Sequence, residues 1–203
     1  MRVFLLLCCL LCVTSCSILP PLKTVPATLY TITQWPENTA KISSSQHGRL
    51  SKTLLVTTPI ALPGYTSSRM IYVKIPYQLK SFSDHFWVAP PAELLLPLIA
   101  HRLQATRYFQ AVVTSPFSGN ANVQLNTKLL TLQQEFLQPV SCVRLVMEAT
   151  LINTGTGQVI ASQIFTAVVA APGDNPYSGV LATNDAAHRI ARQIAQFVVK
   201  SAH

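Results

Sequence analysis

Acidic side chains are scarce in this chain, which has only 7 Asp and Glu among 203 residues. No two of these carboxylates are spaced as the close pair that general acid–base catalysis uses. The histidines also lack a second His, Cys or carboxylate at metal-ligand spacing; they are His47, His85, His101, His188 and His203. A G-x-S-x-G motif and a glycine-rich phosphate loop are missing too. These absences argue against an enzyme, and the sequence predicts no catalytic residue, no cofactor and no metal site.

Charge is low and is not concentrated anywhere along the chain. Charged residues make up 11% of the sequence, and the formal net charge is +8. The 15 Lys and Arg residues are spread from end to end, whereas a nucleic-acid-binding surface concentrates them in a basic stripe. The charge therefore predicts no nucleic-acid partner. It is typical of a solvated surface with some attraction to anionic headgroups or an acidic protein.

A hydrophobic run long enough to span a membrane is missing at the N-terminus. The apolar segment from Val3 to Val13 has about 11 residues, against roughly 20 for a transmembrane helix. With Arg2 before it, this segment is typical of a signal peptide, predicted here as residues 1–15. It leads into Val13-Thr14-Ser15-Cys16, which resembles the lipobox of bacterial lipoproteins. The sequence thus predicts lipid on Cys16, and the alternative is an ordinary signal peptide that happens to contain cysteine.

Lipid on Cys16 would fix the location of the protein. Two or more acyl chains such as palmitate on one residue hold a protein stably at a membrane, whereas a single chain binds marginally. Ser17 stands where an Asp would signal retention in the inner membrane, so it favours the outer membrane. Residues 16–27 are expected to form the lipidated N-terminus and a proline-containing linker. The domain that follows is expected in the periplasm.

Cysteine is almost absent from the rest of the chain. Four of the 5 cysteines lie in the signal peptide or at the cleavage site, and the remaining one is Cys142. The mature protein would then hold a single free thiol and no intramolecular disulfide, although the compartment would allow one. Cys142 lies in an apolar stretch and is expected to be a small buried hydrophobe.

Residue patterns predict seven strands and two helices. Strands are predicted at 28–33, 53–58, 69–75, 110–114, 123–136, 143–152 and 158–169. The phase of alternation in the fifth changes at Leu129-Leu130, which predicts a bulge. The last two enclose an Asn-Thr-Gly-Thr-Gly turn, which predicts a hairpin.

The two predicted helices are amphipathic. The first spans 92–108, and Pro97 is expected to kink it or delay its start. The second spans about 180–200. Its predicted core face consists of Ala187, Ile190, Ala191, Ile194 and Val198. The order strands, helix, long hairpin, helix predicts an α+β fold, with a single mixed, mostly antiparallel sheet packed against two helices. Residues 28–203 are expected to form one domain.

Aromatic residues gather between 77 and 89. They are candidates for core and loop packing or, alternatively, for a surface that binds a partner. The candidate partner surface consists of Tyr77, Phe82, Phe86 and Trp87.

From Thr28 onward the pattern resembles the ABC-type transport auxiliary lipoproteins, including the paraquat-inducible-type lipoproteins that accompany mammalian-cell-entry (MCE) proteins. The motifs that carry the resemblance are Leu29-Tyr30-Thr31-Ile32, Ile71-Tyr72-Val73 with Pro76-Tyr77, Trp87-Val88-Ala89-Pro90-Pro91, Leu103 to Val112, Leu151-Ile152-Asn153, Thr156 to Ile160, Phe165 with Ala171-Pro172, and the Ala-rich C-terminal helix.

The resemblance implies an outer-membrane lipoprotein of Gram-negative bacteria that docks an intermembrane lipid-transport assembly. Its expected partners are MCE-type or permease components of an ABC transporter, whose ATPase would be another chain. Self-association into a homo-oligomer is left open. The alternative function is that of an assembly or pilotin-like lipoprotein in a secretion or outer-membrane biogenesis system, which would need the same anchor and sheet.

Overall fold

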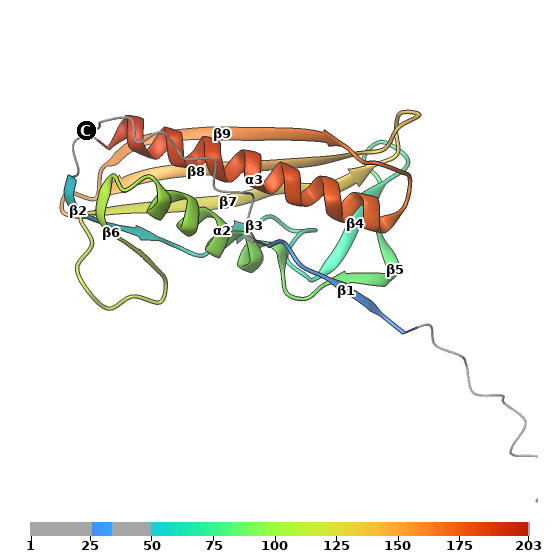
Figure 1. Ribbon diagram of the computed structural model, residues 1–203, viewed down its shortest axis with the longest axis horizontal. Helices are drawn as coiled ribbons and strands as arrows, with labels where there is room; N and C mark the ends of the chain where they lie inside the picture. Colours follow the sequence, from blue (N-terminus) through green and yellow to red (C-terminus); the bar gives the residue numbers. More distant parts are fainter. Residues whose placement is uncertain (1–25, 34–49, 203) are drawn as a thin grey trace, which may run out of the picture.

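The computed structural model describes residues 26–33 and 50–202. The predicted signal peptide and Cys16 lie outside these residues. Within the described part, no helix is long and apolar enough to cross a membrane. This part consists of one nine-stranded sheet and two helices (Figure 1), which confirms the predicted α+β class.

Three long strands form the body of the sheet. β7 (Val123–Glu135), β8 (Cys142–Asn153) and β9 (Val159–Ala170) pair in antiparallel fashion over nearly their whole lengths. In β8, buried and half-exposed side chains alternate, because successive side chains of a strand point to opposite faces. The register of β7 against β8 shifts just after Leu129, which confirms the predicted bulge.

Three short strands line the other edge of β7. β2 (Leu50–Val56), β3 (Ile60–Ala61) and β4 (Arg69–Val73) lie one after another along β7, and each runs parallel to it. The long pairings of the sheet are thus antiparallel, and most of the short ones are parallel. This is the mixed, mostly antiparallel sheet that the sequence predicts.

The two ends of the sheet differ in what extends them. At one end, β6 (Phe109–Thr114) pairs with β2. At the other end, β5 (Lys80–Trp87) pairs antiparallel with β4, and β1 (Thr28–Tyr30) runs parallel to β5. In Figure 1, β4, β5 and β1 lie at the right-hand end, and the chain leaves β1 there towards its N-terminus.

Both helices cover the same face of the sheet (Figure 1). α3 (Pro176–Ser201) lies along β8 and β9, and α2 (Pro91–Ala105) packs against α3 and β6. α3 begins four residues earlier than predicted, because Asn175 caps it by accepting a hydrogen bond from the backbone N–H of Ser178.

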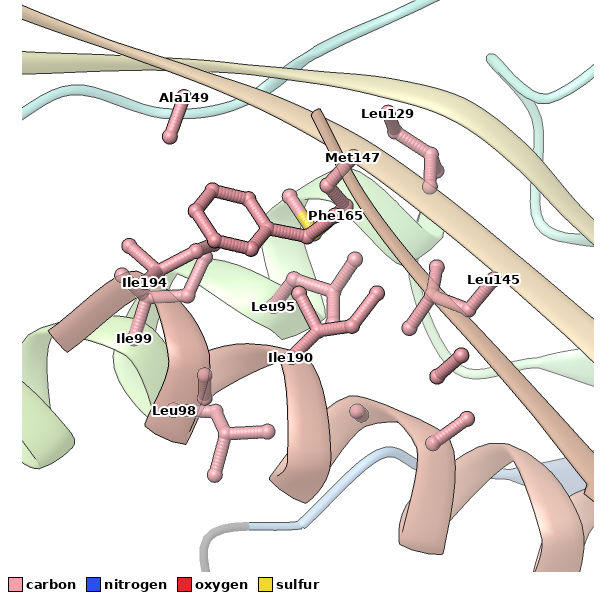
Figure 2. Close-up of a cluster of buried hydrophobic side chains, with 14 of the residues drawn as sticks. Leu95, Leu98, Ile99, Leu129, Leu145, Met147, Ala149, Phe165, Ile190 and Ile194 are labelled. Carbon is pink, nitrogen blue, oxygen red and sulfur yellow. The ribbon is translucent and has the colours of Figure 1, made fainter. Parts of the chain in front are cut away.

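The core lies between the helices and the sheet. Its central side chains come from both helices and from the three long strands, and they interdigitate in Figure 2. They are Leu95, Leu98, Ile99, Leu129, Leu145, Met147, Ala149, Phe165, Ile190 and Ile194. Burying one such large side chain contributes about 1.5–3 kcal/mol. All five residues of the predicted core face of α3 are buried, which confirms that face.

Some predicted boundaries are wrong. α2 starts directly at Pro91, so Pro97 does not delay it. Pro97 and Glu93 are exposed, so water can satisfy the Glu93 carbonyl that Pro97 leaves without a donor. The sequence pattern predicts neither β3 nor β5, and β5 lies in the aromatic segment.

Candidate functional site

The titratable residues that could act in catalysis or metal binding are dispersed over the described fold. Within residues 26–33 and 50–202, no group of three His, Cys, Asp or Glu is placed to hold a metal ion. His85 stacks on Tyr30, with 5.8 Å between ring centroids, and lies 3.7 Å from the Asp84 carboxylate. His101 is exposed on α2. These residues do not converge on a common cavity.

A cluster of four polar side chains lies across the β7–β8 hairpin, on the face away from the helices. Arg144 donates two hydrogen bonds to the Glu135 carboxylate, of 2.8 and 3.1 Å. Gln133 donates a third, of 2.8 Å, and accepts one from the Tyr65 hydroxyl. Burial raises the pKa of Glu135, but the bonds from Arg144 and Gln133 outweigh it, and the pKa lies below its ordinary value. Glu135 is therefore a carboxylate held in place by its pairing with Arg144 and Gln133.

Cys142 sits beside this cluster, half-buried at the start of β8. Burial raises the pKa of its thiol, and the Glu135 charge raises it further. The neutral thiol is a poor nucleophile, because the thiolate is the reactive form. The expectation that Cys142 is a small buried hydrophobe is therefore wrong: it lies on the half-exposed face of β8 with Arg144, and its thiol contacts the Glu135 carboxylate.

A small cleft lies where α3 begins. Met70, Phe82, Trp87, Gln134, Gly179 and Thr183 are among the residues that line it. Its free volume is about 10 Å³, which is room for one water molecule. The buried Gln134 Oε1 has no hydrogen-bond partner among the described atoms, and a water here could donate to it. The cleft is too small for a lipid or a cofactor.

A larger groove runs between β9 and α3. Its free volume is about 380 Å³, and it is open to solvent. Its lining residues are Gln163, Ile164, Phe165, Thr166, Gln193, Gln196, Phe197 and Lys200. Ligand pockets are normally enclosed and mainly apolar, so this wide, amide-rich groove does not have the shape of a small-molecule site.

The structure divides the four residues of the candidate partner surface. Trp87 is only 4% exposed and belongs to the core, whereas Tyr77 is fully exposed. Phe82 and Phe86 are half-buried. Phe82 packs on Tyr72 with 4.6 Å between ring centroids. Of the four side chains, only that of Tyr77 is wholly available to a partner.

The described part of the chain is thus a long sheet covered on one face by two helices, and its titratable residues are dispersed. A family model described as "ABC-type transport auxiliary lipoprotein component" matches residues 30–195 of the chain. The chain belongs to this family. The matched residues of this auxiliary lipoprotein run from β1 into α3, so they take in nearly the whole described fold.

Solved structures share the fold of this auxiliary lipoprotein. Protein XCC0632 from Xanthomonas campestris is similar with a TM-score of 0.76 at 17% identity, over 87% of this chain and 97% of that one. An uncharacterized protein has a TM-score of 0.67 at 12% identity, with 86% and 99% covered. Hypothetical protein CT253 from Chlamydia trachomatis has a TM-score of 0.53 at 10% identity, over 75% of this chain and 98% of that one. At these identities the likeness shows the fold alone. None of the curated proteins matches this chain.

Sequence reasoning missed the Glu135–Arg144 pair and the turn that holds Tyr77 outward. The Glu135–Arg144 pair is visible only once the register of the hairpin is known. The exposure of Tyr77 depends on a turn whose central residue has a positive φ of 67°. A Pro-Tyr pair in the sequence does not predict that conformation, because the position normally favours Gly.

Proposed function

We propose that this lipoprotein is a non-catalytic auxiliary component of an ABC/MCE-type intermembrane lipid transport system, and that it bridges the transporter to the outer membrane. The observation that carries the proposal is the family match over residues 30–195, downstream of the lipobox that ends at Cys16. Membership of this family implies a membrane-anchored periplasmic protein. The outer membrane is the finer part of the proposal, and Ser17 supports it.

The proposed anchor has three parts. Residues 1–15 are the signal peptide, Cys16 carries the acyl chains, and residues 17–27 link it to the domain. Multiple acyl chains would hold the domain at the bilayer surface without a spanning helix. Such an anchor leaves the whole folded domain available for contacts with protein components of the transporter.

A binding role fits the physical character of the described residues. Arg144 and Gln133 hold Glu135 across the hairpin, and the raised pKa of the Cys142 thiol disfavours the reactive thiolate. The cleft at the start of α3 has room for one water molecule, and the groove between β9 and α3 is open to solvent. A docking protein needs a rigid surface, and the long β7–β8–β9 sheet backed by α3 supplies one.

Affinity purification from the bacterial envelope tests the proposal. A tagged, lipidated protein is solubilised in mild detergent, and MCE-type or permease subunits are expected to copurify. The matched control replaces residues 1–16 with an ordinary cleavable signal peptide, which releases a soluble domain into the periplasm. If that domain recovers the same subunits, docking occurs through the fold.

Two outcomes count against the proposal. Recovery of secretion or barrel-assembly components without any transporter subunit would support the assembly or pilotin-like alternative. The second outcome is that transporter subunits copurify only with the lipidated form, and no more strongly than unrelated membrane proteins do. That result would indicate only that both proteins reside in the same membrane.

A further inference from the structure

Two loops meet at the end of the sheet that carries β4 and β5. Residues 74–79 connect β4 to β5, which starts at Lys80, and residues 136–141 connect β7 to β8. The loops touch: the Phe136 N–H donates to the Val73 carbonyl over 2.8 Å. The Lys74 ammonium lies 5.6 Å from the centroid of the Phe136 ring, within the range of a cation–π contact. We refer to residues 74–80 and 136–140 together as the end loops.

The end loops expose an unusual amount of apolar surface. Five large hydrophobic side chains on them are at least 44% exposed: Ile75, Tyr77, Leu79, Leu137 and Val140. Apolar patches larger than a few hundred Å² are rare on soluble monomeric proteins, and they mark sites that bind a protein or a membrane. The end loops therefore have the character of a contact surface.

The backbone holds Tyr77 outward at a conformational cost. Residues 75–78 form a turn in which the Gln78 N–H donates to the Ile75 carbonyl over 3.1 Å. Pro76 takes the second position, and Tyr77 takes the third with φ 67°. This is the pattern of a type II turn, whose third position favours Gly. Strain at a residue whose side chain makes little contact with its own domain points to a role for that side chain in binding.

The charge of the end loops is exclusively positive. Lys74 and Lys80 flank the turn, and neither Asp nor Glu occurs within residues 74–80 or 136–140. Among the ion pairs of the described residues, none includes Lys74 or Lys80. Apolar and aromatic side chains flanked by lysines match the interface of a bilayer, where Tyr is enriched and cations meet anionic headgroups.

The described part of the chain enters β1 from the same end of the molecule. β5 begins at the end loops, and β1 runs parallel to β5, so the chain enters β1 from the direction of these loops. Figure 1 shows the chain leaving β1 at the end where β4 and β5 lie. Cys16 and Thr28 are twelve positions apart, which allows a reach of at most about 40 Å. A bilayer anchored at Cys16 can thus meet the end loops.

We propose that the end loops insert into the headgroup region of the bilayer that holds the lipid anchor, and so orient the domain with β4 and β5 towards the membrane. This inference rests on the proposed anchoring of Cys16. A lipid surface explains the end loops better than a protein partner with a binding groove does. The apolar residues lie on protruding loops that lysines flank, at the end of the sheet from which the chain enters β1. β9 also exposes apolar residues, but it carries no charge and its outer edge runs along the side of the sheet.

Quenching by brominated lipids tests the proposal on the full lipidated protein. A Tyr77→Trp variant is reconstituted into vesicles of phosphatidylethanolamine and phosphatidylglycerol that carry brominated acyl chains. The matched control is Val159→Trp, at the opposite end of the sheet, where the native side chain is 59% exposed. Unsubstituted protein supplies the background from Trp35 and Trp87, and thermal melts confirm that both variants fold.

The expected result is loss of the added emission of Tyr77→Trp in brominated vesicles, while Val159→Trp keeps its emission. Phosphatidylcholine vesicles should give weaker quenching, because they offer Lys74 and Lys80 no net negative charge. Equal quenching of both variants, or of neither, would overturn the proposal. The proposal would also be overturned if the Tyr77→Trp side chain became shielded from solvent only when transporter subunits are added, since that identifies a protein partner. Protein that fails to join the vesicles at all refutes the lipid anchor instead.

Discussion

Replacing Arg144 with Met should destabilise the domain by leaving the Glu135 carboxylate buried without its main partner. Glu135 is 7% exposed and loses two charge-assisted hydrogen bonds, of 2.8 and 3.1 Å. Hydrogen bonds to a charged group contribute about 1.5–3 kcal/mol to stability. The Arg144 side chain is 40% exposed, so water replaces part of the loss, and we expect the lower half of that range.

The pH dependence of this effect has a definite sign. In the native protein the pKa of Glu135 is lowered, so its contribution is full above the unfolded-state pKa and is lost as the pH falls through the folded-state value. In Arg144→Met, burial is opposed only by the hydrogen bonds from Gln133 and Cys142, and the pKa of Glu135 should rise. The destabilisation relative to the native protein should therefore shrink as the pH falls through the raised pKa of Glu135 in the variant, where its carboxyl takes up a proton.

Urea unfolding at pH 7 and near pH 4.5, followed by circular dichroism, measures both effects. Arg189→Met is the control, because its pair with Asp185 is exposed on α3 and should matter little at either pH. A loss of stability in Arg144→Met that is equal at both pH values would refute the assigned role of the Glu135 charge.

Three further substitutions test the packing. Ile194→Asp should remove most of a typical stability margin of about 5–15 kcal/mol, whereas Gln196→Asp should be nearly silent; equal melting temperatures would show that the buried face is wrong. Gly179→Ala should cost about 1–3 kcal/mol in urea melts, because an added Cβ collides with the Gln134 side chain, and a gain in stability would contradict this. Tyr77→Gly should change stability by no more than about 1 kcal/mol, because relief of backbone strain offsets the added chain entropy; a larger loss in the same melts would mean that Tyr77 packs on its own domain.

The parts of the fold that sequence predicts well are those with long, regular periodicity. In β8 and α3, the positions whose side chains can reach the core recur at a fixed spacing. Apolar residues such as Ile190, Ile194 and Val198 occupy those positions, so the sequence pattern predicts which residues are buried. β5 was missed because its register against β4 is irregular and its two faces are both partly covered. The parallel placement of β2, β3 and β4 along β7 depends on contacts between distant segments, which periodicity does not encode.

The candidate site was predictable only in part. The sequence pointed to the aromatic segment, but exposure separates Tyr77 from Trp87, and exposure follows from the positions of β4 and β5. The apolar residues of the second end loop, Leu137 and Val140, became relevant only because the register of β7 against β4 brings that loop beside Lys74. Local composition cannot reveal such a juxtaposition.

Lipid attachment to Cys16 is the premise on which the localisation, the tether and the membrane orientation all depend. Metabolic labelling with a palmitate analogue, on native protein and on Cys16→Ala, tests it most directly. We predict that the native protein is labelled and fractionates with the outer membrane, while Cys16→Ala is unlabelled and accumulates as an uncleaved or mislocalised precursor. Label on Cys16→Ala, or none on the native protein, would contradict the assignment of a lipid anchor at this residue.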